Sequence, residues 1–110
     1  MTPEAKLKSK IASLLTQRGI FFVRVKQGPG STVGVPDIIG CWNARMFAIE
    51  VKAPGRYENC YEGCRKDSPT QYEFLRRLKL AGGLALVVDN IDDIEHHFPR
   101  PASYQADTGT

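Results

Sequence analysis

Apolar residues first recur at helical spacing near the N-terminus, at Leu7, Ile11, Leu14 and Leu15. A Thr2 cap and a proline in the first turn precede this stripe, and Gly19 follows it. Caps of this kind favour a helix start, and glycine favours a helix end. The pattern therefore predicts a helix from residue 2 to about residue 18.

The apolar pattern then changes to that of strands, over residues 20–25, 35–42, 46–51 and 84–88. These segments are rich in β-branched and aromatic residues, which favour strands. The break at Asn43-Ala44 has the length of a hairpin turn, so the second and third segments are expected to pair as an antiparallel hairpin.

A second helix is predicted from Ser68-Pro69-Thr70-Gln71, which reads as a capping box, to about Leu80. Residues 53–67 are polar and are expected to be irregular, and residues 90–97 suggest a short capped helix. Residues 1–98 are expected to form one α/β domain, and residues 99–110 a flexible tail.

Composition changes this picture little. The 110 residues are 42% hydrophobic and 25% charged, which is typical of a globular domain, and the net charge of +3 permits an anionic partner. No apolar run is long enough for a membrane span and the first residues do not resemble a signal peptide, so a cytoplasmic location without a membrane partner is expected.

Three cysteines without a secretory signal argue against a disulfide framework, and Cys41, in an apolar strand, is expected in the core.

Basic residues occur in clusters: Lys6, Lys8 and Lys10; Arg24 and Lys26; Arg76, Arg77 and Lys79. If these clusters converge they would form a surface for phosphates; the alternative is a set of solvated faces. Residues 56–66 mix Tyr57 and Tyr61 with Arg56, Arg65 and Lys66. That mixture suits unpaired bases and phosphates, although an ordinary surface loop has the same composition.

Three charged residues interrupt the apolar hairpin: Asp37 at the start of its first strand, and Glu50 and Lys52 at the end of its second. In an antiparallel hairpin these two ends are neighbours, so Asp37 is expected near Glu50. Glu50 and Lys52 are two residues apart and therefore share a face of the sheet. Two neighbouring carboxylates in an apolar setting are costly unless something compensates their charge.

A divalent cation is the natural compensation. Mg²⁺ prefers oxygen ligands, so two carboxylates and a strand carbonyl suit it, and Lys52 would then face a bound water or a phosphate oxygen. The alternative is a Glu/Lys pair on a solvated edge, with Asp37 merely starting a strand. Glu-x-Lys alone is common, but a preceding Gly-Val-Pro-Asp one hairpin earlier strengthens the metal-site interpretation.

Pro36-Asp37 followed by Glu50-Val51-Lys52 resembles the signature of the PD-(D/E)xK nucleases. Gly34 before Pro-Asp and Gln71 at the start of the next helix make the chain most similar to the VRR-NUC branch, the virus-type replication-repair nucleases. The resemblance covers about residues 4–90. It implies a restriction-endonuclease-like αβββαβ core with a mixed central sheet, which agrees with the predicted order of elements.

The resemblance also implies roles for particular residues. Asp37, Glu50 and the backbone carbonyl of Val51 would hold Mg²⁺ or Mn²⁺, and Lys52 would orient or deprotonate the attacking water. Gln71 would reach the active site, in competition with its role in the helix cap. Glu4 would complete the metal site, or would be only a carboxylate that stabilises the helix N-terminus.

The function implied is a metal-dependent, structure-specific DNA endonuclease that resolves branched, four-way DNA as a homodimer. DNA contacts are expected from Arg24, Lys26, Arg56, Arg65 and Lys66. One alternative is a flap or single-strand nuclease that acts as a monomer, and another is a non-catalytic nucleic-acid-binding module. A structural zinc site formed by Cys60 and Cys64 with His96-His97 is a further alternative, although its ligand spacing is unusual.

Overall fold

A computed structural model describes residues 1–26, 34–55, 64–66 and 68–99 of the chain. The elements are α1 (Pro3–Gln17), β1 (Phe21–Arg24), β2 (Ile38–Trp42), β3 (Arg45–Val51), α3 (Pro69–Leu80), β4 (Leu84–Val88) and α4 (Ile91–His97). Their order confirms the predicted succession of helices and strands. Residues 64–66, within a segment expected to be irregular, are helical.

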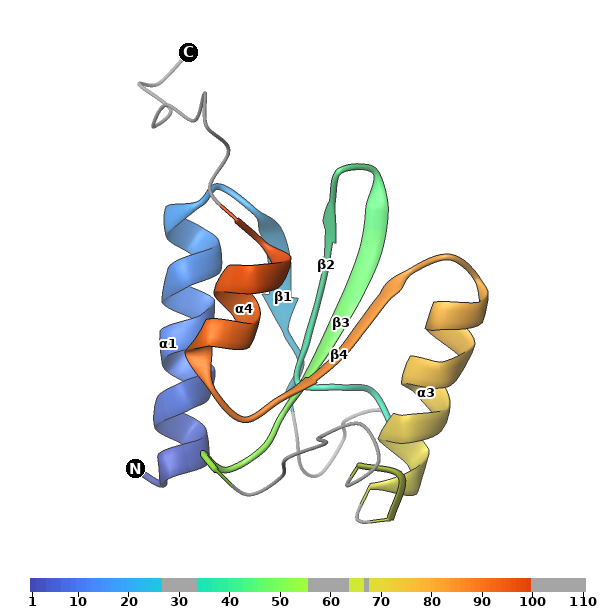
Figure 1. The fold of residues 1–110 in the computed structure, drawn as a ribbon, viewed down its shortest axis with the longest axis horizontal. Helices are drawn as coiled ribbons and strands as arrows, with labels where there is room; N and C mark the ends of the chain where they lie inside the picture. Colours follow the sequence, from blue (N-terminus) through green and yellow to red (C-terminus); the bar gives the residue numbers. More distant parts are fainter. Residues whose placement is uncertain (27–33, 56–63, 67, 100–110) are drawn as a thin grey trace.

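The four strands form one mixed sheet in the order β1-β2-β3-β4. β1 pairs antiparallel with β2 and β2 with β3, whereas β4 lies parallel to β3 after the chain has passed through α3. In Figure 1, α1 and α4 lie on one side of this sheet and α3 lies on the other. The chain is thus a mixed α/β fold with helices on both faces of the sheet.

The β2–β3 hairpin forms as predicted, with its turn at Asn43 and Ala44. Their φ angles are 53° and 61°, the left-handed values that two-residue hairpin turns require. The turn pairs Trp42 with Arg45, and the register continues to Ile38 opposite Ile49. One residue further along each chain, Asp37 comes opposite Glu50, so the turn fixes which residues meet at the far end of the hairpin.

The start and end of α1 also follow the sequence. The hydroxyl of Thr2 accepts a hydrogen bond of 3.1 Å from the backbone N–H of Ala5, which is the expected N-cap. Arg18 caps the C-terminus, and Gly19 follows with a φ of 68°. The helix consequently presents Leu7, Ile11 and Leu15 to the sheet.

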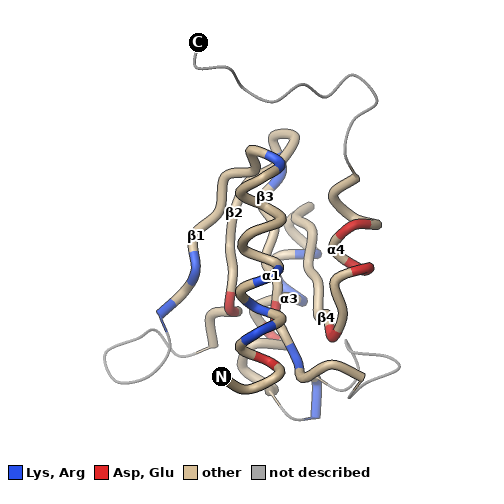
Figure 2. Tube along the Cα trace, turned by 90° about the vertical axis from the view of Figure 1, so that its left-hand side faces the viewer, with Lys and Arg blue, Asp and Glu red and all other residues tan. Residues whose placement is uncertain are grey.

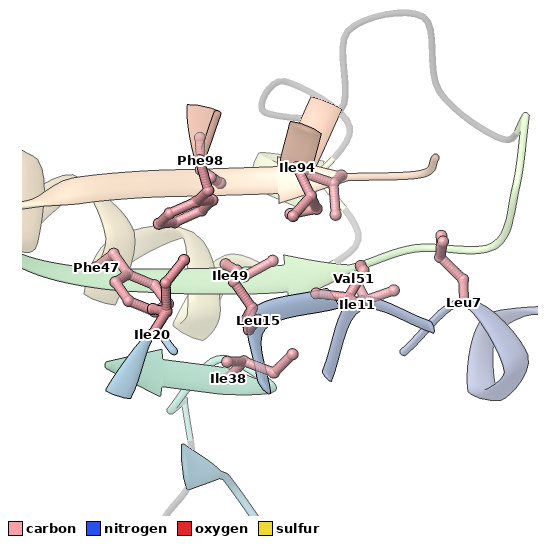
Figure 3. Close-up of a cluster of buried hydrophobic side chains, with 12 residues drawn as sticks. Leu7, Ile11, Leu15, Ile20, Ile38, Phe47, Ile49, Val51, Ile94 and Phe98 are labelled. Carbon is pink, nitrogen blue, oxygen red and sulfur yellow. The ribbon is translucent and has the colours of Figure 1, made fainter. Parts of the chain in front are cut away.

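The main core lies between the sheet and the helices α1 and α4, as Figure 3 shows. Alternate residues of each strand point into it, so β3 contributes Phe47, Ile49 and Val51. The other members of the cluster are Leu7, Ile11, Leu15, Ile20, Ile38, Leu86, Val88, Ile94 and Phe98. The odd-numbered residues of β3 are therefore committed to this face, and Glu50 and Lys52 face the opposite way.

The opposite face is only partly covered. α3 packs on β3 and β4, around a smaller cluster of Ala48, Cys64 and Leu75. Towards the edge strand, Phe21, Val23 and Met46 remain 66%, 48% and 42% exposed.

Cys41, predicted as a core residue, is exposed, so that prediction is wrong. Cys41 pairs with Phe21 on one side and Met46 on the other, which places it in this uncovered row. An apolar strand has two faces, and the sequence of β2 does not say how far a helix extends over each of them.

Within the described residues, no helix combines the length and the apolar character needed to cross a membrane. Of the predicted tail, residues 99–110, all but Pro99 lie outside the described part of the chain.

Candidate functional site

The two carboxylates expected to meet do meet, at the end of the hairpin away from its turn. Asp37 and Glu50 are each 7% exposed. A carboxylate oxygen of Asp37, Oδ2, accepts a hydrogen bond of 2.8 Å from the backbone N–H of Val51. Glu50 follows Ala48 by two residues and leaves the sheet on the face that α3 covers. The backbone of β3 thus fixes the orientation of the carboxylate that comes from just before the start of β2.

Lys52 lies beside this pair, on the same face as Glu50. Its Nζ is 3.5 Å from Oε2 of Glu50 and donates a hydrogen bond of 2.6 Å to the hydroxyl of Ser68. Lys52 is 9% exposed, so this ammonium group is almost withdrawn from solvent. The residue that precedes α3 therefore holds in place the lysine that directly follows β3.

Ser68 was predicted as half of a capping box, and this prediction is wrong. The Ser68 side chain makes no capping hydrogen bond, and its backbone N–H donates to the carbonyl of Cys64. The Gln71 side-chain oxygen accepts a hydrogen bond of 2.9 Å from the Thr70 hydroxyl instead of one from the Ser68 backbone. The Ser68 hydroxyl instead accepts the hydrogen bond from Lys52. This contact joins distant segments of the chain, so a local cap pattern does not reveal it. The predicted contact between Gln71 and the active site stays a prediction.

Lys8 is a member of the site that the sequence did not single out. Its Nζ is 3.2 Å from the Oδ1 atom of Asp37, and its side chain is 20% exposed. Lys8 comes from α1, on the other side of the sheet, and reaches Asp37 around the end of the sheet. One signal was present in the sequence: Lys8 is one turn before Ile11 and Ala12 on the buried side of the helix.

The electrostatics of the site depend most strongly on Glu50. Burial, and next the negative charge of Asp37, raise the pKa of Glu50 from 4.5 to about 7, and the Lys52 ammonium offsets only part of this rise. The Oε1 atom of Glu50 is buried and has no hydrogen-bond partner among the described residues. A buried carboxylate oxygen without a partner is costly, and a bound cation is one way to satisfy it.

The donor atoms fit a hard divalent cation. Asp37 and Glu50 offer carboxylate oxygens from neighbouring segments of the hairpin. The Oε1 atom of Glu50 has no hydrogen-bond partner among the described residues, so it could bind a cation. Across the described ranges, no three side chains of His, Cys, Asp or Glu gather closely enough to hold one ion. Glu4 therefore does not join the two carboxylates in this structure, and a cation there would complete its shell with backbone oxygen and water.

Two of the predicted DNA-binding residues lie close to the acidic pair. Arg24 and Lys26 are exposed and flank Val25, whose N–H donates a 2.8 Å hydrogen bond to the carbonyl of Asp37. They therefore lie at the same end of the sheet as the acidic pair. Figure 2 shows Lys and Arg residues at this end of β1 and along α1, whereas Asp and Glu mark α4.

Of the remaining predicted contacts, Arg65 and Lys66 are exposed just before α3, and Arg56 lies outside the described residues. The zinc interpretation finds no support in the described residues: Cys64 packs on the α3 face of the sheet, whereas His96 and His97 end α4 on the other face. Cys60 lies outside the described part of the chain.

Comparison with known proteins adds no assignment: no protein-family model and no curated protein sequence matches the chain. The interpretation of the site therefore rests on its own residues and their geometry.

Proposed function

We propose that this chain is a metal-dependent nuclease that hydrolyses phosphodiester bonds in DNA, with the restriction-endonuclease-like core of the PD-(D/E)xK nucleases and closest in motif to their VRR-NUC branch. One observation carries the proposal. The hairpin register, extended by one residue beyond Ile38 and Ile49, sets Asp37 opposite Glu50, both carboxylates are buried, and the Lys52 ammonium is 3.5 Å from Glu50. Two acids and a lysine held together in this way are the minimal set for metal-assisted phosphodiester hydrolysis.

Asp37, Glu50 and the backbone carbonyl of Val51 would hold Mg²⁺ or Mn²⁺. The bound cation would polarise the scissile phosphate and lower the pKa of a water that it coordinates. The hydrogen bond from Val51 to Oδ2 keeps the Asp37 carboxylate in one orientation, with its other oxygen 3.2 Å from the ammonium of Lys8. Such support from backbone groups is what keeps ligands in a productive arrangement.

Lys52 acts on the attacking water and on the phosphate. Its hydrogen bond to Ser68 and its contact with Glu50 place the ammonium between β3 and the start of α3. From there it orients the water and stabilises the negative charge that develops on the phosphate oxygens in the transition state. Gln71, in the first turn of α3, assists in positioning the water or the phosphate.

DNA is the proposed substrate because exposed basic residues lie near the acidic pair. Arg24 and Lys26 flank the residue that pairs with Asp37, and Lys8 contacts Asp37 directly. Cations around a hydrolytic site track the phosphates on both sides of the scissile bond.

We further propose that the chain acts as a homodimer on branched DNA. A four-way junction needs two symmetric cuts, and a domain of this size offers one site. The uncovered apolar row at the β1 edge supports this, because Phe21 is 66% exposed there and such patches mark contact surfaces.

DNA cleavage tests the proposal. Purified protein is incubated with Mg²⁺ or Mn²⁺ and a panel of linear, flap, splayed and four-way DNA substrates, beside the Asp37→Ala variant. The expected result is metal-dependent cleavage of the four-way substrate, abolished by the substitution and by EDTA. Salt-dependent binding without cleavage would instead identify a non-catalytic nucleic-acid-binding module, and preferential cleavage of flaps by a monomer would replace junction resolution.

A further inference from the structure

We propose that Lys8 is a displaceable counter-charge for the metal site: its ammonium occupies Asp37 when no metal is bound, gives way to the divalent cation, and then binds a DNA phosphate. This inference rests on the proposed function, since it assigns a positioning and regulatory role within the same site. Lys8 belongs to α1 and is separate from the acidic pair and from Lys52.

The two carboxylate oxygens of Asp37 contact different parts of the molecule. Its Oδ2 atom is engaged by the backbone N–H of Val51, at 2.8 Å, and its Oδ1 atom by Lys8, at 3.2 Å. The backbone contact belongs to the β2–β3 hairpin and remains whatever binds. Oδ1 is therefore the oxygen that a cation would use, and Lys8 is the group already on it.

The two lysines of the site differ in how firmly they are held. Lys52 is 9% exposed, directly follows β3 and is hydrogen-bonded to Ser68. The Lys8 side chain is 20% exposed, comes from a helix on the other side of the sheet, and is held by an ion pair with Asp37. A lysine stem is long and flexible, so Lys8 can leave Asp37 without any change in the backbone.

Two buried carboxylates side by side repel each other, and two ammonium groups, one against each, compensate part of this repulsion without a metal. A divalent cation on the same Oδ1 atom would lie within a few ångströms of the Lys8 ammonium, where like charges repel strongly in a weakly solvated site. Metal and Lys8 therefore compete for Asp37.

Displacement gives Lys8 a second role. The basic residues Arg24 and Lys26 flank the strand position that pairs with Asp37, so a DNA backbone drawn to this end of the sheet passes close to Lys8. A DNA phosphate that pairs with the Lys8 ammonium draws it away from Asp37, where it would otherwise compete with the metal. Binding of DNA and binding of metal should then strengthen each other, as reciprocal linkage requires.

Calorimetric titration of the DNA-free protein with Mn²⁺ tests the proposal without relying on activity. The variants are Lys8→Met, which removes the charge and offers no oxygen ligand, and Lys8→Ala, which removes the stem as well. Lys8→Arg keeps the charge, and Lys10→Met makes the same change on an exposed residue of the same helix. Removal of the competitor should tighten Mn²⁺ binding about 10-fold in Lys8→Met and Lys8→Ala. Lys8→Arg and Lys10→Met should bind Mn²⁺ like the wild type.

The outcomes separate this inference from the proposed function. If the wild type and all variants bind no Mn²⁺, the metal site itself is refuted and Lys8 has nothing to regulate. If the wild type binds Mn²⁺ but Lys8→Met and Lys8→Ala bind it equally or more weakly, the displaceable counter-charge is refuted and the nuclease proposal stands. Circular dichroism in EDTA confirms that each variant is folded, and a purely structural ion pair would lower the stability of Lys8→Met without tightening metal binding.

Discussion

The Lys52 ammonium donates a hydrogen bond of 2.6 Å to the Ser68 hydroxyl, which ties the end of β3 to the start of α3. Together with the 3.5 Å contact to Glu50, this hydrogen bond restrains the lysine side chain between the two elements. The Ser68 hydroxyl therefore contacts Lys52 instead of capping α3 as its sequence pattern predicts, and in the proposed chemistry it would position the lysine.

A first prediction concerns this pair. Lys52→Ala should retain Mn²⁺ binding but slow DNA cleavage by about 10²- to 10⁴-fold, because the group that orients water and stabilises charge is lost. Ser68→Ala should slow cleavage by about 10-fold, mainly through kcat, because the lysine remains but is less well held. Single-turnover cleavage with saturating Mn²⁺ measures both. Undiminished cleavage by Lys52→Ala would remove this residue from the mechanism.

The second prediction is the pH dependence of stability without metal. Burial and the charge of Asp37 raise the pKa of Glu50 from 4.5 in the unfolded chain to about 7 in the folded protein. The folded state thus holds this proton more tightly, so the stability that Glu50 contributes is fully present below pH 4.5 and is lost as the pH rises through 7. The loss should be about 2–3 kcal/mol in the free energy of unfolding.

Urea unfolding in EDTA across this pH range measures the effect, with Glu50→Gln as the matched variant. Glu50→Gln should match the wild type near pH 4.5 and exceed its stability near pH 8, because it no longer buries a charge. Parallel stability profiles for the two proteins would show that Glu50 titrates normally and would contradict the electrostatic description of the site. Added Mn²⁺ should stabilise the wild type most at high pH, where Glu50 is ionised.

A third prediction concerns the homodimer. The apolar row at the β1 edge would be buried between two copies, so Phe21→Glu should dissociate the dimer while Ser13→Glu, an exposed change on α1, should not. Sedimentation velocity at micromolar concentration distinguishes these states. A wild-type protein that sediments as a monomer would count against junction resolution and favour a nuclease that acts on flaps or single strands.

The parts of the molecule that could be predicted are those set by neighbouring segments of the chain. The turn at Asn43-Ala44 fixes the register of the hairpin, and that register alone brings Asp37 opposite Glu50. Local signals also located α1, whose start is capped by Thr2 as expected. The acidic pair was therefore foreseeable without knowledge of the packing of helices.

The missed features depend on packing between distant segments. Lys8 reaches Asp37 only because the first half of α1 packs near the end of the sheet where Asp37 lies, and Ser68 meets Lys52 only because α3 starts beside β3. Cys41 is exposed because α3 covers β3 and β4 but leaves the β1 side open. Neither a periodicity nor a motif within one segment contains this information.

The most direct test of the proposed centre is the stoichiometry of Mn²⁺ binding, measured by calorimetry on the wild type, Asp37→Asn and Glu50→Gln. If the two carboxylates share one cation, the wild type binds one Mn²⁺ in this site and each substitution alone weakens that binding by at least about 10-fold. If either variant binds Mn²⁺ as tightly as the wild type, or the wild type binds none, the acidic pair is not a metal site and the nuclease proposal is contradicted.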